Sequence, residues 1–211
     1  SHVQHEALNF GGHAKPALDG FHIYQDGAWR IVPHGGGKLG GLVPDGPGAL
    51  VAGSRYKGLF RFDPATGAQQ DLDVPLPEKE HCLFLHRNPA GHLLLVVARP
   101  SQFMRLPPVR NGWLGQLLAI RDGQPRVLLD GVDFSRAFHD KGRPAVDVPE
   151  GTFLAESQSG LLFVPADATT VRRLGWRSGV PLRHVDRMRI HGRRLYLLDR
   201  QQGFVVLDYP A

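Results

Sequence analysis

Short apolar runs alternate with short polar turns along the whole chain, and one pattern recurs five times. In each copy a Gly precedes four or five mostly apolar residues, and an Asp or an Asp-containing turn follows. The copies begin at Gly20, Gly58, Gly115, Gly160 and Gly203. Successive starts are therefore 38, 57, 45 and 43 residues apart. A period of about 40 to 45 residues, built from strand-length runs, predicts a repeat protein with four short strands in each unit.

The turn that follows each apolar run has the chemistry of a tight hairpin. Asp26-Gly27 and Asp122-Gly123 each supply a Gly that adopts positive φ, and residues 63–67 read Asp-Pro-Ala-Thr-Gly, in which Pro presets φ. Such hairpins would join the third strand of each unit to a short, partly polar fourth strand that faces water at a sheet edge. We expect the fourth strands at 29–32, 69–74, 126–129 and 171–174.

Apolar runs upstream of the recurring Gly predict the first and second strands of each unit. Second strands are expected at 49–52, 92–98, 152–155 and 194–198. First strands are expected at 39–43, at 82–85, within 132–148 and at 185–190. On this reading the N-terminal unit lacks its first two strands and the C-terminal unit lacks its fourth.

Repeated four-stranded units predict an all-β, β-propeller-like fold with four to five small antiparallel blades, because each blade of a propeller is one twisted sheet that packs on its neighbours. The strand-like runs exclude a solenoid of helices. Since the end units are short of strands, we expect either an incomplete propeller or a fragment of a larger one. An exposed blade edge at either end would favour dimerisation through strand pairing.

The composition fits many short strands. The 211 residues include 26 Gly and 17 Pro, scattered as turn residues, and no apolar run approaches the roughly 18 residues of a membrane-spanning helix. Ser1 and His2 are typical of the residues that remain after cleavage of an expression tag. We expect a tag remnant and irregular segment at 1–19, and a single propeller-like domain at 20–211 with a loop insertion at 99–113.

The charge narrows the partner classes only slightly. The formal net charge is +5, and the excess comes from dispersed arginines, which are typical of solvated strand faces. A nucleic-acid-binding surface would concentrate Lys and Arg in one stripe, so nucleic acid is not an expected partner. A start without Met is compatible with removal of a signal or anchor, which favours a periplasmic or secreted protein. The single Cys82 excludes an internal disulfide and gives no evidence on compartment.

The segment 49–67 resembles a repeat of the periplasmic propellers of bacterial two-component sensors, which carries Gly-Leu-aromatic-Arg-aromatic-Asp after two apolar residues and a Gly-Thr pair. Its last part, residues 61–67, also resembles a hairpin of gluconolactonase-type propellers. The resemblance implies the propeller architecture, and no catalytic residue follows from it. Gluconolactonase-type enzymes hold a divalent metal with a Glu, an Asn and an Asp on inner strands, whereas Asn88 and Asn111 lie in predicted turns here.

The insertion at 99–113 is the main candidate for a binding surface, because loops on a rigid scaffold often carry recognition. Its apolar and aromatic residues are interleaved with arginines, a mixture typical of interface hot spots. The alternative is that these apolar side chains cap the blade below. Together with two aromatic residues of the neighbouring face, the predicted binding residues are Phe103, Met104, Arg105, Trp113, Tyr56 and Trp176.

A metal site is a second candidate, formed by His139, Asp140 and Glu156 in an acidic stretch between two predicted blades. Divalent cations need several converging ligands of these types. No fixed metal motif is present, and ordinary surface hydrogen bonding explains the same residues. We therefore expect no cofactor, with calcium or another divalent metal as the alternative.

The sequence contains no recognisable catalytic motif that would favour an enzyme. There is no Gly-x-Ser-x-Gly elbow, and Cys82 is predicted at a core strand position from which the adjacent His81 points to the opposite face. Residues 35–38 lack the rest of a phosphate-binding loop. We therefore predict a non-enzymatic binding module, of the sensor, partner-binding or inhibitory kind, for a protein or a small ligand. The alternative is a metal-dependent, lactonase-like hydrolase that uses the 139–156 group.

Overall fold

The computed structural model describes nine segments of the chain, which form eighteen strands and no α-helix. The described residues are 2–4, 20–34, 39–54, 57–76, 81–98, 114–133, 145–156, 160–175 and 178–209. None of them belongs to a helix long and apolar enough to cross a membrane.

The strands form five antiparallel sheets, which we call blades 1 to 5 in chain order. Blade 1 contains β1 (His2–Gln4), β2 (Gly20–Gln25) and β3 (Ala28–Pro33). Blade 2 contains β4 (Leu39–Pro44), β5 (Leu50–Ser54), β6 (Gly58–Phe62) and β7 (Gln69–Asp71), and blade 3 contains β8 (His81–Arg87), β9 (Leu93–Ala98), β10 (Leu114–Arg121) and β11 (Gln124–Asp133). Blade 4 contains β12 (Ala145–Val148), β13 (Gly151–Glu156), β14 (Gly160–Pro165) and β15 (Arg172–Leu174), and blade 5 contains β16 (Val185–His191), β17 (Arg194–Asp199) and β18 (Gly203–Asp208).

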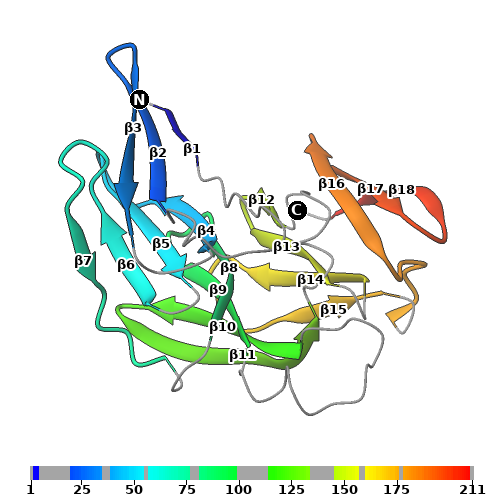
Figure 1. Cartoon of the computed structure of the whole chain (residues 1–211). Helices are drawn as coiled ribbons and strands as arrows, with labels where there is room; N and C mark the ends of the chain where they lie inside the picture. The colour runs from blue at the N-terminus through cyan, green and yellow to red at the C-terminus, as the bar shows by residue number, and fades with distance from the viewer. Residues whose placement is uncertain are drawn as a thin grey trace, which may run out of the picture.

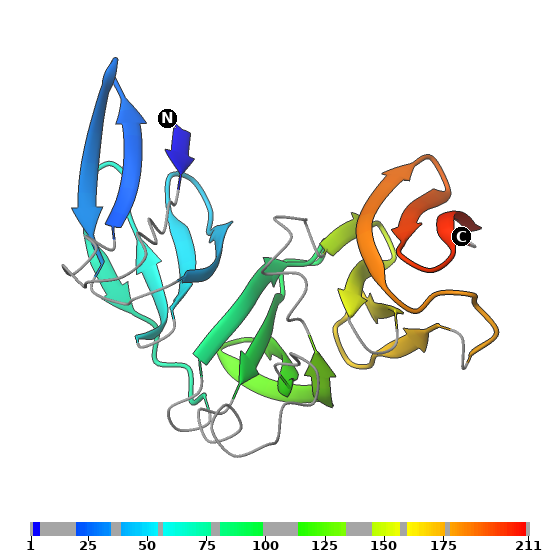
Figure 2. The same cartoon turned by 45° about the vertical axis from the view of Figure 1, so that its right-hand side comes forward.

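In every blade the strands lie side by side in their order along the chain. The blades follow one another along an open arc, with blade 1 and blade 5 at its two ends (Figures 1 and 2). The all-β fold with small antiparallel blades is therefore confirmed. Of the segment 1–19, residues 2–4 add one strand to blade 1.

The core lies between the blades, because strands of the middle blades carry apolar residues on both faces. In blade 2, Ala52 and Phe60 pack in a cluster with blade 1, whereas Val51 and Leu59 pack in a cluster with blade 3. Two further clusters join blade 3 to blade 4 and blade 4 to blade 5. Among the described residues no buried cluster joins blade 5 to blade 1.

Glycines on the first two strands of blade 2 allow the first strand of blade 3 to approach closely. A Cβ on Gly53 would lie 2.3 Å from Cys82 Sγ, and one on Gly41 would lie 2.7 Å from the carbonyl oxygen of Leu85. Cys82 is buried, which confirms its predicted core position. The first strand of blade 3 is therefore packed directly against blade 2.

The fourth strand of blade 2 is shorter than the sequence predicts. Strand β7 ends at Asp71, because the N–H groups of Val74 and Leu76 donate to the carbonyls of Leu72 and Val74, two residues back, and turn the chain away. The side chains of Leu72, Val74 and Leu76 pack against the cluster between blades 2 and 3. Leu72 and Val74, which the prediction placed in this strand, serve this packing instead.

Candidate functional site

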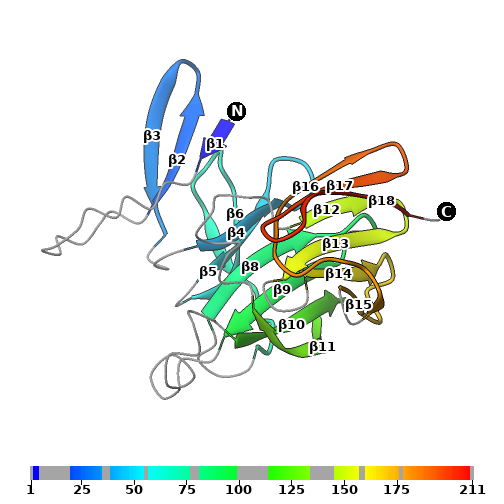
Figure 3. The same ribbon diagram turned by 90° about the vertical axis from the view of Figure 1, so that its right-hand side faces the viewer.

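The meander gives every blade two distinct sides. Tight hairpins such as 45–49, 63–68, 88–92 and 122–123 join first to second and third to fourth strands, and we call their side the turn side. Connections from second to third strands, and from one blade to the next, leave from the opposite side, which we call the loop side. The first strands of blades 2 and 3 run in the same direction, since Arg87 at the end of β8 bonds to Pro44 at the end of β4. Figure 3 shows the stacked sheets from the side.

The predicted binding residues all belong to connections of the loop side. The insertion 99–113 follows β9, Tyr56 follows β5, and Trp176 follows β15. These residues, including Phe103, Met104, Arg105 and Trp113, lie outside the described residues. The flanking strands nevertheless end or begin on the loop side, and the assignment of a binding surface stays a prediction.

The predicted metal site is described only at Glu156. His139 and Asp140 lie outside the described residues, between β11 and β12. Glu156 is the last residue of β13 and is buried. Within the described segments, no group of three or more His, Cys, Asp or Glu side chains is arranged to hold a metal.

Asp199 occupies the same place in blade 5, at the end of the second strand on the loop side. Its Oδ2 accepts the backbone N–H groups of Arg183 (2.9 Å) and His184 (2.7 Å), and its Oδ1 accepts those of Gln201 (2.8 Å) and Gln202 (3.0 Å). Burial would raise the pKa of Asp199, but these four donors together hold it below the usual range. Asp199 thus joins the connection into blade 5 to the turn between β17 and β18.

A similar but smaller cap ends the second strand of blade 2. Ser54 is buried, and its Oγ accepts the backbone N–H of Lys57 at 2.9 Å. Buried polar residues therefore recur where second strands end, and they stabilise the base from which loop-side connections leave. Sequence reasoning missed this role, although Ser54, Glu156 and Asp199 each stand four residues before a recurring Gly.

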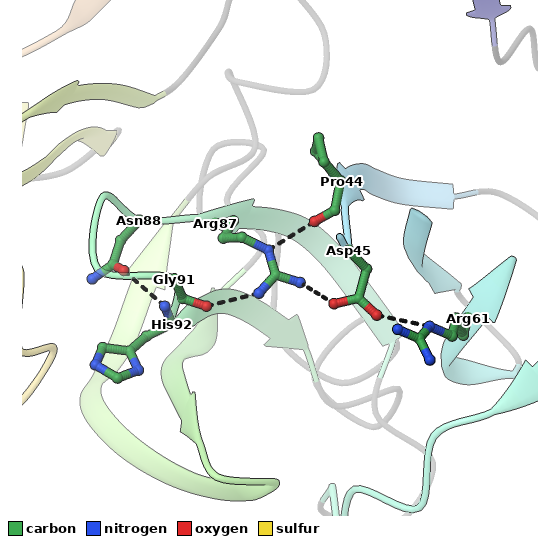
Figure 4. A network of polar contacts seen from close by, with 7 residues as sticks. All are labelled: Pro44, Asp45, Arg61, Arg87, Asn88, Gly91 and His92. Atoms are coloured by element: carbon green, nitrogen blue, oxygen red, sulfur yellow. Dashed lines mark hydrogen bonds and ion pairs between the residues drawn. The ribbon is translucent and has the colours of Figure 1, made fainter. Parts of the chain in front are cut away.

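A polar network on the turn side joins blade 2 to blade 3 (Figure 4). The Arg87 guanidinium donates to Asp45 Oδ1 and to the carbonyls of Pro44 and Gly91, each at 2.8 Å. Asp45 Oδ2 lies 2.9 Å from Arg61 Nε. The Asp45 carboxylate and the Arg87 guanidinium therefore connect the 45–49 hairpin of blade 2 to the 88–92 hairpin of blade 3.

Asn88 extends the network to blade 4. Its Nδ2 donates to the carbonyl of Ala166 at 2.8 Å, while its Oδ1 accepts the backbone N–H of His92 at 2.9 Å. Asn88 is buried in a turn, as the Asn-Pro-Ala-Gly sequence predicts. Its amide stabilises the hairpin and the blade contact.

One His-Asp-Thr cluster bridges the first strands of blades 3 and 4. His86 Nε2 on β8 and Asp147 Oδ1 on β12 are 2.9 Å apart, and the Thr152 hydroxyl donates to the same oxygen at 2.8 Å. Partial burial would raise the pKa of Asp147, but the hydrogen bonds from His86 and Thr152 and the charge of His86 together lower it. Because the Thr152 proton goes to Asp147 and not to His86, the cluster does not activate a hydroxyl nucleophile.

Comparison with known proteins agrees with this architecture. No protein-family model and no curated protein matches the chain. The extracellular domain of BT4673, described as a one-component system of B. thetaiotaomicron, aligns with 92% of the chain at a TM-score of 0.59 and 12% identity. This chain has a β-propeller-like fold. YCF48 bound to a D1 peptide aligns with 90% of the propeller (TM-score 0.52, 15% identity), as does the extracellular domain of the hybrid two-component system BT3049 of B. thetaiotaomicron (TM-score 0.51, 16% identity).

The propeller is short compared with these structures. It spans 26% of the BT4673 domain, 23% of the BT3049 domain and 58% of YCF48. At these identities the likeness shows the fold alone.

Proposed function

We propose that this propeller is a non-enzymatic binding module that recognises its partner through the loop side. One observation carries the proposal. The six predicted binding residues are spread from Tyr56 to Trp176, yet all belong to connections whose flanking strands end on the same side of the blades. Such loops on rigid sheets are the usual place for recognition residues.

The partner we propose is a protein segment that buries aromatic and apolar anchors. Phe103, Met104 and Trp113 supply such anchors, and Arg105 supplies a donor that pairs with carboxylates or backbone carbonyls. YCF48, which shares the fold, has been solved with a bound peptide, and this supports a peptide-like partner.

Two side chains that could suggest catalysis have structural roles. Burial raises the pKa of the Cys82 thiol to about 12, which leaves almost no thiolate at neutral pH. The His86 ring is held by Asp147 between two blades. These contacts support a binding role over nucleophilic chemistry.

We also propose an extracytoplasmic location, in the periplasm or outside the cell, as the sensory part of a receptor or as a separate partner-binding protein. The support is the fold shared with two extracellular sensor domains of B. thetaiotaomicron. Fractionation of the source cells, followed by detection with an antibody against this chain, tests the location. Recovery with the cytoplasmic fraction would contradict it.

The binding role is tested with a peptide selected on the wild-type protein from a displayed random library. We expect Phe103→Ala and Trp113→Ala each to weaken binding by about ten-fold or more, because a buried aromatic anchor contributes ~2 kcal/mol. Isothermal titration calorimetry measures the affinity, and denaturant unfolding measures the stability. Val127→Ala, on an exposed position of β11, is the matched control and should change neither.

The opposite result has a clear meaning. If both variants lose roughly 3 kcal/mol of unfolding free energy while the folded protein keeps its affinity, the aromatic residues cap the blade and do not bind a partner.

A further inference from the structure

The two end blades each leave one apolar face uncovered. Seven large apolar side chains are strongly exposed among the described residues, and six of them lie on these two faces, with exposed fractions between 43 and 68%. Blade 1 carries Tyr24, Trp29 and Ile31, and blade 5 carries Leu198, Phe204 and Val206. The middle blades have no such face, because a buried cluster covers them on both sides.

The register shows that each set forms one continuous face. In blade 1, Tyr24 pairs with Trp29, and their rings lie 5.2 Å apart, while Ile31 pairs with His22 on the same face. The one charged residue of the β2–β3 pair, Arg30, points the other way and donates to the Ala65 carbonyl of blade 2 at 2.8 Å. The uncovered face of blade 1 is therefore aromatic and carries no formal charge from β2 or β3.

The uncovered face of blade 5 has a different chemistry. Phe204 pairs with Leu198, and Val206 pairs with Tyr196. Arg187 and Arg189 of β16 are exposed and pair with the same two β17 residues, so their guanidinium groups border the apolar centre. This face is therefore apolar in the middle and cationic along one side.

The blade 5 face is complementary to the blade 1 face and not to a second copy of itself. Guanidinium groups stack favourably on the faces of Trp and Tyr, and apolar blade faces pack on each other throughout this fold. Two blade 5 faces would bring together Arg187 and Arg189 of both copies, in addition to the Arg194–Asp208 ion pair that each face carries. In the structure the two faces stand at opposite ends of the arc, uncovered by the described part of the same chain (Figure 2).

We propose that two copies of this chain associate head to tail, with the blade 5 face of one copy packed on the blade 1 face of the next. The contact extends the stack of blades across the molecular boundary. It uses sheet faces, unlike the strand-edge dimerisation expected from the sequence. Because the two contributing surfaces differ, the contact is heterologous and can join successive copies.

Sedimentation velocity over a range of protein concentrations tests this proposal. We expect the wild-type protein to self-associate as its concentration rises. Trp29→Asp and Phe204→Asp should each weaken self-association by at least about ten-fold, because a carboxylate would be buried at the centre of the contact. Val127→Asp places the same charge on the remaining exposed apolar position, on blade 3, and should associate like the wild type.

A mixing experiment identifies the head-to-tail arrangement. The Phe204→Asp variant keeps its blade 1 face, and the Trp29→Asp variant keeps its blade 5 face, so an equimolar mixture should form a heterodimer and nothing larger. Near-unchanged thermal midpoints show that both variants are folded. A wild-type protein that stays monomeric, a single variant that still self-associates, or a mixture that does not form heterodimers would each overturn the proposal.

Discussion

At the scale of single residues, buried polar groups at strand ends hold this propeller together. Asp199 is the fullest case, because its two oxygens accept four backbone N–H groups, two from the connection into blade 5 and two from the β17–β18 turn. Ser54 and Asn88 do the same for single turns. Such residues look ordinary in the sequence, since their importance depends on which backbone groups the fold brings to them.

Asp199→Asn should lower the free energy of unfolding by roughly 2 kcal/mol, because an amide has one oxygen and its NH₂ group would face two backbone donors. Urea unfolding measures the change. Asp208→Asn is the matched control, since Asp208 is exposed and its ion pair within the described segments is with Arg194 at 3.1 Å. This substitution should cost less than about 0.5 kcal/mol. Equal losses in both variants would contradict the capping role of Asp199.

At the scale of strands, the sequence predicts the fold well wherever a blade is locally defined. The recurring Gly begins the third strand of its blade at Gly58, Gly160 and Gly203, lies one residue after its start at Gly115, and begins the second strand of the three-stranded blade 1 at Gly20. The contacts between blades could not be predicted, because no sequence pattern states which residue of one blade faces which residue of the next. His86 and Asp147, for example, are 61 residues apart. The binding residues remain a prediction, since the sequence places them in connections whose conformation no periodicity defines.

The His86–Asp147 pair makes the junction of β8 and β12 sensitive to acid. An Asp whose folded-state pKa lies below its unfolded value stabilises the fold above pH ~4 and loses this contribution as the pH falls through the folded pKa. We expect Asp147→Asn to be less stable than the wild type at neutral pH, with the difference shrinking below pH ~4. Thermal unfolding from pH 7 to pH 3 measures it. A difference that stays constant over this range would show that Asp147 contributes no charge-dependent stability.

At the scale of the whole molecule, the propeller behaves as a row of units that contact only their neighbours. Every buried cluster among the described residues joins successive blades, so blade 3 is supported from both sides and blades 1 and 5 from one. Local stability should therefore be higher in blade 3 than in blades 1 and 5.

Hydrogen exchange followed by mass spectrometry tests this gradient. Backbone amides of β9, whose residues Leu93–Val97 are all buried, should exchange most slowly, and those of β2 and β18 should exchange sooner. The measurement is made at low protein concentration, and with the Trp29→Asp variant as a control that removes contacts between copies. Equal protection of β2 and β9 in that variant would show that the blades unfold as one unit.

The strictly sequential meander also bears on how the chain folds as it leaves the ribosome. All hydrogen-bonded strand pairs join strands that are consecutive in the chain, and no described pair needs both termini at once. Contacts of short sequence separation form early and with a small loss of loop entropy. Blade 2 can therefore complete its sheet and cover the inner face of blade 1 while blades 4 and 5 are still being synthesised. Each newly made blade would find the apolar face of the preceding one already formed as a surface on which to pack.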